Sequence, residues 1–478
     1  MSTGQQPSVQ EQLDTLRQFR QAAYECLGPA RDAQFELTDA VLLTPVVRSF
    51  VELSQTPVFR RRWSSTYAAI ADGRPDRAAL LRLYAQHLPA TPRPVLAGDH
   101  TAWPRPHAPT LRDRTVEHQP TPVPGNKPIT VGQGYSTVAW VPPGRTGSWA
   151  LPLLHERISS AEAPITKAAD QLRRVCAVLP SRPIALYDAE YGCAPFVQAT
   201  ADLPADKVFR LRPNRCLYGP PVYGGQGRRP KHGAKFKLSD ASTWGPPAAR
   251  CEIEDPQLGP VQVCLWRDQH FRAAAEHPVL VVRIERRAAP GTRRDPKDLW
   301  LGWLGQEPPP LAQWWWLYLR RFAVDHWYRF AKQRQHWTRP SFATPEQAER
   351  WSDLMPLLTW ELWLARPLVA DRPRPWQKRQ RAGPAPRAEQ TAAPTPGPEQ
   401  RATPPAAPAG QPQPGPQSEL TPGRVCQGMG AVLVAIGTPA RVPKPRGKAL
   451  GWRAGRQRQR RPRCPVVKKG RKRQKKAA

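Results

Sequence analysis

No apolar run in the 478-residue sequence approaches the roughly 20 residues that a membrane-spanning helix needs. The first residues, MSTGQQPSVQEQLD, also lack the basic-then-apolar layout of a secretion signal. Eight cysteines are scattered along the chain without a Cys-x-x-Cys pair, which argues against a zinc site and against a disulfide framework. These absences predict a cytoplasmic protein with reduced cysteines and no membrane partner.

Acidic residues are scarce relative to basic ones. The chain has 38 Asp and Glu against 72 Lys and Arg, a formal net charge of +34. An excess this large repels itself unless a polyanion neutralises it, so nucleic acid is the leading partner. A merely soluble basic protein is the alternative.

The C-terminal residues 441–478 contain no acid at all and 17 Lys or Arg, half of the net charge. This composition predicts a flexible, disordered tail that binds phosphates, with a simple solubility tail as the alternative.

The first part of the chain changes pattern near residue 90. Apolar residues recur at three- and four-residue spacing through residues 1–90, which predicts a helical N-terminal region. Over residues 91–206, three short β-type runs, one helical segment and a fourth β-type run follow each other between turns rich in Pro and Gly. This order predicts a layered α/β fold.

Three further segments follow before the basic tail. Short strands and basic loops over residues 207–306 predict a β-rich insertion, and residues 307–372 return to a helical pattern. Residues 373–440 form a segment rich in Pro and Ala, which is expected to be a linker. Its stretch 382–422 is so poor in large apolar groups that we expect an extended or disordered linker.

Two acids follow apolar runs of the predicted α/β segment. Asp99 comes after PVLAG and Asp188 comes after PIALY. Open α/β sheets place their ligands and chemistry at the carboxyl ends of such strands, although an acid there is as often a cap or a turn former. Either acid alone is therefore a weak signal.

A third acid lies within YLRRFAVDHWYRFAK, where Asp325 is the lone carboxylate among arginines and lysines. If residues 311–337 are one helix, Tyr318, Arg321, Asp325 and Lys332 share one of its faces. The alternative is a surface salt bridge between Arg321 and Asp325, but the many aromatic neighbours favour a packed helix.

Three carboxylates from two strands and a helix suit two Mg²⁺ ions about 4 Å apart, because Mg²⁺ prefers hard oxygen ligands and completes its shell with waters and substrate phosphate. One ion would activate the attacking water or 3′-hydroxyl, and the other would stabilise the leaving oxygen. Asp99, Asp188 and Asp325 are therefore candidate metal ligands for phosphodiester transfer.

The stretches AGDHTAWPRP, YDAEYG and YLRRFAVDHWYRFAKQ resemble the three motifs of bacterial insertion-sequence transposases of the DDE superfamily. The third is the most specific, because one branch has Tyr, Arg, Glu and Lys at the spacing of Tyr318, Arg321, Asp325 and Lys332. The β-rich insertion is similar too. This sequence departs from the branch in one respect: its third acid is Asp325, one methylene shorter than Glu.

The resemblance implies a ribonuclease H-like catalytic core interrupted by the insertion, and a DNA-binding role for the helical N-terminal region. It implies two Mg²⁺ ions, for which Mn²⁺ may substitute. The implied partner is double-stranded DNA, at the element ends and at the target, bound by a dimer in the synaptic complex. The implied location is the cytoplasm of a bacterium, in association with the nucleoid.

The resemblance also implies that Tyr318, Arg321 and Lys332 contact phosphates near the cleaved end. Arg105, which flanks the first acid, is also expected to bind DNA. Trp103 would stack on an unpaired base, with a core aromatic as the alternative for Trp103. The expected function is a transposase that cuts at the ends of its element and joins them to target DNA. Two alternatives remain: a catalytically impaired DNA-binding protein derived from a transposase, and a ribonuclease H-like nuclease without strand transfer.

Overall fold

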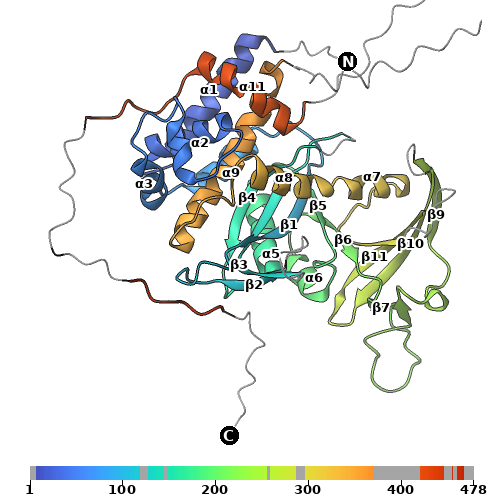
Figure 1. The fold of residues 1–478 in the computed structure, drawn as a ribbon. Coiled ribbons are helices and arrows are strands. Elements are labelled where there is room, and N and C mark those ends of the chain that lie inside the picture. The colour runs from blue at the N-terminus through green and yellow to red at the C-terminus, as the bar shows by residue number, and fades with distance from the viewer. Residues whose placement is uncertain are drawn as a thin grey trace, which may run out of the picture.

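Twelve strands of the chain form one mixed sheet, and helices pack along it and at one end of it (Figure 1). The computed structural model describes residues 7–118, 128–144, 148–255, 259–286, 297–370, 420–445, 455 and 460–467.

Four α-helices and a 3₁₀-helix precede the sheet, as the apolar spacing predicted. They are α1 (Val9–Cys26), α2 (Arg31–Leu43), η1 (Phe50–Gln55), α3 (Ser64–Asp72) and α4 (Arg77–Gln86). Ser8 caps α1 by accepting a hydrogen bond from the Glu11 amide, and the Glu11 side chain accepts one from the Ser8 amide. This reciprocal capping satisfies two amides that the first turn would leave unpaired. The DNA-binding role of the helical region stays a prediction.

The strands of the sheet come from the whole middle of the chain. They are β1 (Val95–Pro104), β2 (Thr115–His118), β3 (Ile129–Trp140), β4 (Leu151–Ile158), β5 (Ile184–Tyr187), β6 (Asp206–Leu211), β7 (Cys216–Tyr218), β8 (Lys235–Lys237), β9 (Ala249–Asp255), β10 (Gly259–Phe271), β11 (Ala274–Arg286) and β12 (Leu299–Leu304). Their order is β2-β3-β1-β5-β6-β12-β11-β10-β7-β8, with β4 also paired to β3 and β9 to β10.

The core half of the sheet combines antiparallel and parallel pairs. Strand β3 pairs antiparallel with β1 and with β4, whereas β1, β5 and β6 are parallel to one another. Helix α5 (Pro164–Cys176) connects β4 to β5 and packs against β1, β3 and β4, and α6 (Ala194–Thr200) connects β5 to β6. This mixed α/β arrangement is consistent with a ribonuclease H-like domain.

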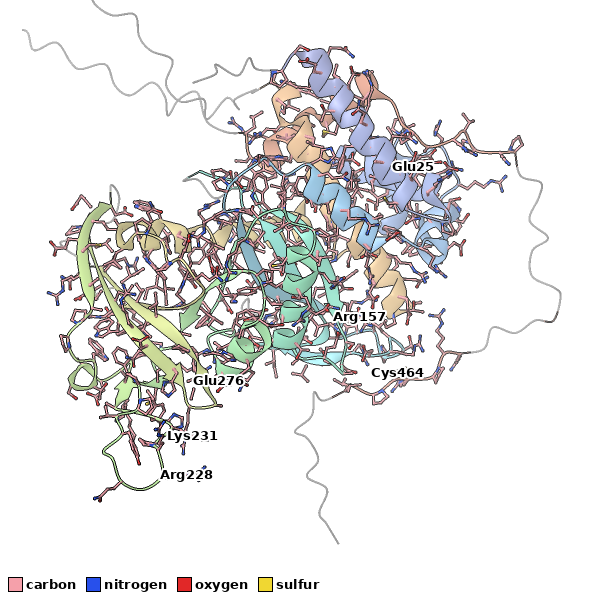
Figure 2. All side chains as sticks on the ribbon, turned by 180° about the vertical axis from the view of Figure 1, so that it is seen from behind. Glu25, Arg157, Arg228, Lys231, Glu276 and Cys464 are labelled. Atoms are coloured by element: carbon pink, nitrogen blue, oxygen red, sulfur yellow. The ribbon has the colours of Figure 1, made fainter. Side chains whose placement is uncertain are left out.

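The strands predicted for the insertion continue the same sheet and do not make a separate layer. Strand β12 pairs antiparallel with β6 of the core, and β11, β10, β7 and β8 extend outward from there. A loop with Arg228 and Lys231 projects beyond these strands (Figure 2).

The helical pattern after the insertion forms three helices, α7 (Trp314–Leu319), α8 (Phe322–Gln333) and α9 (Pro345–Ala365). The prediction of one helix over 311–337 was wrong, because the chain tightens at Arg320 and Arg321. There the amides of Arg321 and Val324 bond to carbonyls three residues back, the pattern of a 3₁₀ turn. The tightening ends α7 and begins α8.

Stacked aromatic rings join the N-terminal helices to the sheet. The Tyr84 ring of α4 lies parallel to the Trp360 ring of α9 at 5.6 Å, and Trp360 stacks in turn on Trp140 of β3 at 6.4 Å. Such contacts add to the apolar area that each ring buries, so helices and sheet share one continuous core.

The segment predicted as a linker contains an ordered helix. Residues 371–419 lie outside the described residues, but α11 spans Pro422–Ile436 and packs against α2 and α9. The buried side chains on α11 are Val425, Met429, Val432 and Leu433, an apolar stripe at helical spacing. The linker prediction was therefore wrong for 422–436, because the abundance of Pro and Ala before this stretch masked its apolar period.

Part of the predicted flexible tail is docked on the core. The amide of Cys464 donates to the Pro109 carbonyl and that of Val467 to the Arg114 carbonyl, both at 2.8 Å, and Figure 2 shows Cys464 beside the core. Val467 also forms a parallel bridge with Thr115 of β2. The prediction of a disordered tail therefore fails for 460–467, where backbone hydrogen bonds fix the chain, and its other residues are largely outside the described part.

Candidate active site

The parallel pairing of β1 and β5 brings the first two acids to one edge of the sheet. The last residues that pair are Gly98 of β1 and Tyr187 of β5. Asp99 and Asp188 directly follow this pair. Neighbouring strands lie about 4.8 Å apart. Gly98 permits this approach, because a Cβ there would lie 2.1 Å from the Tyr187 ring.

Arg321 joins the third acid to the first. Its guanidinium lies 3.0 Å from Oδ2 of Asp325 and 3.4 Å from Oδ2 of Asp99, 222 residues away in sequence. The Arg321 side chain is only 9% exposed, whereas that of Asp325 is 41% exposed. The ion pair of Arg321 with Asp325 considered from the sequence therefore forms, but it is not a simple surface pair, because the arginine is buried between a strand and a helix.

The three acids act on one another electrostatically. Burial raises the pKa of Asp99 well above its ordinary value, and the charges of Asp188 and Asp325 raise it further, while Arg321 opposes the rise. Burial would lower the pKa of Arg321, but Tyr318 and all three acids raise it. Burial and the neighbouring carboxylates thus disfavour the charged form of Asp99, and a bound cation would favour it.

Asp188 lies in a turn that its own side chain stabilises. Its Oδ1 accepts a hydrogen bond of 2.9 Å from the Glu190 amide. Nearby, the ring of His100 lies 3.2 Å from the Tyr191 hydroxyl and 3.5 Å from the Glu190 carboxylate. These contacts hold the loop that follows β5 against His100 of β1.

Two more residues of the third motif face the same edge. Tyr318 is buried, which raises its pKa to about 12, and its hydroxyl is close enough to Arg321 and Asp188 to be influenced by both charges. Lys332 donates a hydrogen bond of 2.7 Å to Thr101 of β1. Burial lowers the pKa of Lys332 to about 8.

Trp103 and Arg105 are placed differently from their predicted roles. Trp103 is 1% exposed and packs among Tyr135, Trp337 and Phe342, so its ring is a core aromatic and does not stack on DNA here. Arg105 donates to the carbonyls of Pro340 and Phe342, both at 3.1 Å. The structure thus favours structural roles for both.

The sequence reasoning missed Tyr328, whose hydroxyl lies 2.8 Å from the main-chain oxygen of Asp99. The sequence indicates Tyr328 only as one of the aromatic neighbours that favour a packed helix. Its position three residues after Asp325 was the available signal, because residues three apart share a helix face.

The donor groups at this edge suit a divalent cation in their chemistry. Carboxylate oxygens are hard ligands, and Mg²⁺ is commonly held by one or two carboxylates together with water and substrate phosphate. Within the described part of the chain, however, no group of three or more His, Cys, Asp or Glu side chains is arranged to hold one ion. The positively charged guanidinium of Arg321 instead lies against Asp99 and Asp325.

Residues 23–272, just over half of the chain, match the family described as DDE superfamily endonuclease. The chain belongs to this family. The matched range includes Asp99 and Asp188 and ends before α8, so the role of Asp325 rests on the geometry above. No curated protein matches the sequence significantly.

Membership of the DDE superfamily endonuclease family indicates a transposase-like nuclease and implies DNA as the substrate. Nucleases of this superfamily generally use divalent metal ions. No helix in the described ranges is long and apolar enough to cross a bilayer.

Proposed function

We propose that the protein is the DNA transposase of an insertion sequence, which cuts DNA at the ends of its element and transfers those ends into target DNA. The main support is the meeting of Asp99, Asp325 and Arg321 at the edge where Asp188 follows β5. Three segments far apart in sequence supply these groups, and an arrangement of this kind suits phosphodiester chemistry.

In this proposal Asp99, Asp188 and Asp325 hold the divalent ions, Mg²⁺ or Mn²⁺ in its place. The bound ions would supply Lewis-acid activation of the attacking water or 3′-hydroxyl and stabilisation of the leaving oxygen. Oδ2 of Asp325 pairs with Arg321 at 3.0 Å, so a bound ion would compete with the guanidinium for this oxygen.

The basic side chains at this edge orient the substrate. Arg321 offers a planar, permanently charged group that can pair with two phosphate oxygens at once. Lys332 adds a point charge next to β1, held there by its hydrogen bond to Thr101. Tyr318, beside Arg321, offers a hydroxyl for a further phosphate oxygen.

A supercoiled plasmid carrying both element ends and a second plasmid as target test the proposal in the presence of Mg²⁺. Wild-type protein is expected to excise the element and to join its 3′-ends to the target. Asp99→Ala and Asp188→Ala are expected to abolish both steps, whereas Asp202→Ala, at an exposed acid outside the site, should leave both unchanged.

The products separate the alternatives. Nicks or breaks without joined strands would indicate a nuclease that lacks strand transfer. Tight DNA binding without any cleavage would indicate a catalytically impaired binding protein. Unchanged excision by Asp99→Ala and Asp188→Ala would contradict the assignment of the site.

A further inference from the structure

A chain of hydrogen bonds connects α8 to three strands directly behind the first acid. The Tyr328 hydroxyl oxygen of α8 lies 2.8 Å from the main-chain oxygen of Asp99 in β1 and 2.8 Å from Oγ1 of Thr137 in β3. Thr137 Oγ1 lies in turn 2.8 Å from Nδ1 of His155 in β4. Each of these four residues is buried.

The main-chain oxygen of Asp99 fixes the direction of every hydrogen bond in this series of four residues. A carbonyl oxygen only accepts, so the single hydroxyl hydrogen of Tyr328 points to Asp99. The short contact between Tyr328 and Thr137 then requires the Thr137 hydroxyl to donate to the Tyr328 oxygen. Thr137 has no second hydrogen, so its oxygen accepts from His155, which must carry its hydrogen on Nδ1.

The surroundings of His155 agree with this neutral form. Burial lowers the pKa of His155 to about 3, so the ring is uncharged at neutral pH. Its Nε2 has no hydrogen-bond partner among the described residues, and a bare nitrogen there leaves no donor unpaired. The ring lies 5.0 Å from Trp327 and 4.6 Å from Trp337, which excludes water from it.

We propose that Tyr328 is a positioning residue for the metal-binding acids, resting on the proposed function above. Its hydroxyl fixes the main chain of Asp99 against α8, the helix that carries Asp325, and Thr137 and His155 orient that hydroxyl. Lys332 fixes the same helix to Thr101, two residues further along β1. The distance between the first and third acids is thereby set by side chains outside the acids.

The hydrogen position on His155 provides a test that does not depend on catalysis. Nitrogen NMR of protein with ¹⁵N-labelled histidine is expected to show one ring with a protonated Nδ1 and a bare Nε2, which His155→Gln removes. In Tyr328→Phe the Thr137 hydroxyl loses its acceptor. The Nδ1 resonance of His155 should then shift, because Tyr328 no longer orients the Thr137 oxygen that accepts its hydrogen.

Tyr84→Phe is the matched control, since it removes a buried hydroxyl that has no partner among the described residues. It should leave the His155 signal unchanged. A wild-type His155 with its hydrogen on Nε2, or a signal that Tyr328→Phe does not alter, would overturn the directed chain.

The positioning role is tested by Mn²⁺ binding to the DNA-free protein, measured by calorimetry. Tyr328→Phe is expected to weaken Mn²⁺ binding about tenfold, the lower end of what groups behind metal ligands contribute. Thr137→Val keeps the side-chain shape and should also weaken Mn²⁺ binding. This variant tests the positioning role if Tyr328→Phe does not fold. Tyr84→Phe should have the wild-type affinity.

Unchanged Mn²⁺ affinity in both Tyr328→Phe and Thr137→Val would overturn the positioning role. Failure of the proposed function is recognised separately, because wild-type protein itself would then bind no Mn²⁺ at this edge and cleave no DNA. The tautomer of His155 would still report whether the directed chain exists.

Discussion

Two buried arginines of this protein each lie between two carboxylates, one in the helical bundle and one at the sheet edge. Arg20 of α1 pairs with Asp39 of α2 at 2.8 Å and with Glu361 of α9. Arg321 lies 3.0 Å from Asp325 and 3.4 Å from Asp99. The composition is the same, but the surroundings differ.

The cluster in the bundle is closed, whereas the cluster at the sheet edge is open. The side chains of Arg20, Asp39 and Glu361 are at most 4% exposed, and they join three helices. At the edge, the Asp325 side chain is 41% exposed, and Asp188 adds a third negative charge. Enclosed charges that pair only with one another stabilise a fold, whereas a group of three carboxylates that is partly open to solvent leaves room for a cation and a substrate.

The largest expected effect is on stability in the bundle. Arg20→Met leaves two buried acids without their partner and is expected to lower the free energy of unfolding by about 3–5 kcal/mol. Arg321→Met should lower it clearly less, because Asp325 remains accessible to water. Chemical denaturation of both variants measures the difference, and equal losses would remove the distinction between the clusters.

The next effect is on catalysis at the edge. Asp99→Asn is expected to slow DNA cleavage more than about a hundredfold, since groups behind metal ligands already contribute tenfold to a hundredfold. Its melting temperature should be unchanged or higher, because repulsion among the three acids falls. Asp39→Asn, the counterpart in the bundle, should lower the melting temperature but keep the wild-type cleavage rate per folded molecule.

A smaller effect is expected from lengthening the third acid. Asp325→Glu adds the methylene that the resembling transposases have, and should speed cleavage about tenfold if reach limits the site, because misplacement by about 1 Å can cost a hundredfold. A plasmid cleavage assay compares it with Asp170→Glu on the exposed face of α5. A slower Asp325→Glu would show that the surrounding side chains are fitted to the shorter acid.

The smallest effect concerns pH. Lys332 has a pKa of about 8 in the folded protein because burial disfavours its charge, against an ordinary value of 10.5. The unfolded chain binds more protons between these values, so the contribution of Lys332 to the free energy of unfolding rises as pH increases through this interval. The affinity for DNA should fall over the same interval, because Lys332 loses its positive charge.

Binding titrations at constant salt check this sign. Between about pH 7 and pH 9, wild-type protein should lose roughly threefold more DNA affinity than Lys332→Arg, whose charge persists. If the DNA affinities of the two proteins changed equally with pH, Lys332 would not contact DNA.

Local patterns were sufficient to predict the type of element at each acid. The apolar runs before Asp99 and Asp188 predicted β1 and β5, but β1 continues past Asp99 to Pro104, so the strand end expected at Asp99 was wrong. The spacing in the third motif indicated the pairing of Arg321 with Asp325, four residues apart. The helical N-terminal region followed from its periodicity. Each of these features depends on neighbours in sequence.

Most of the features that the sequence did not predict depend on contacts between residues that are distant in sequence. One further feature, a helix, follows a stretch whose composition is typical of a linker. The contact of Arg321 with Asp99 and the chain from Tyr328 to His155 require the relative placement of α8 and three strands, which no local pattern contains. Trp103 is apolar and follows a polar stretch, so only tertiary packing decides that it is buried. Helix α11 was hidden by the Pro- and Ala-rich residues before it.

The central claim is that acids from β1 and β5 belong to one catalytic site. Rates of Mg²⁺-dependent plasmid cleavage by Asp99→Asn, Asp188→Asn and the double variant test it most directly, at equal DNA occupancy. Each single variant should lose more than about a hundredfold, and the double variant should be no slower than the slower single one, because groups that act as a unit are not additive. A wild-type rate in Asp188→Asn, or losses that multiply in the double variant, would contradict the claim.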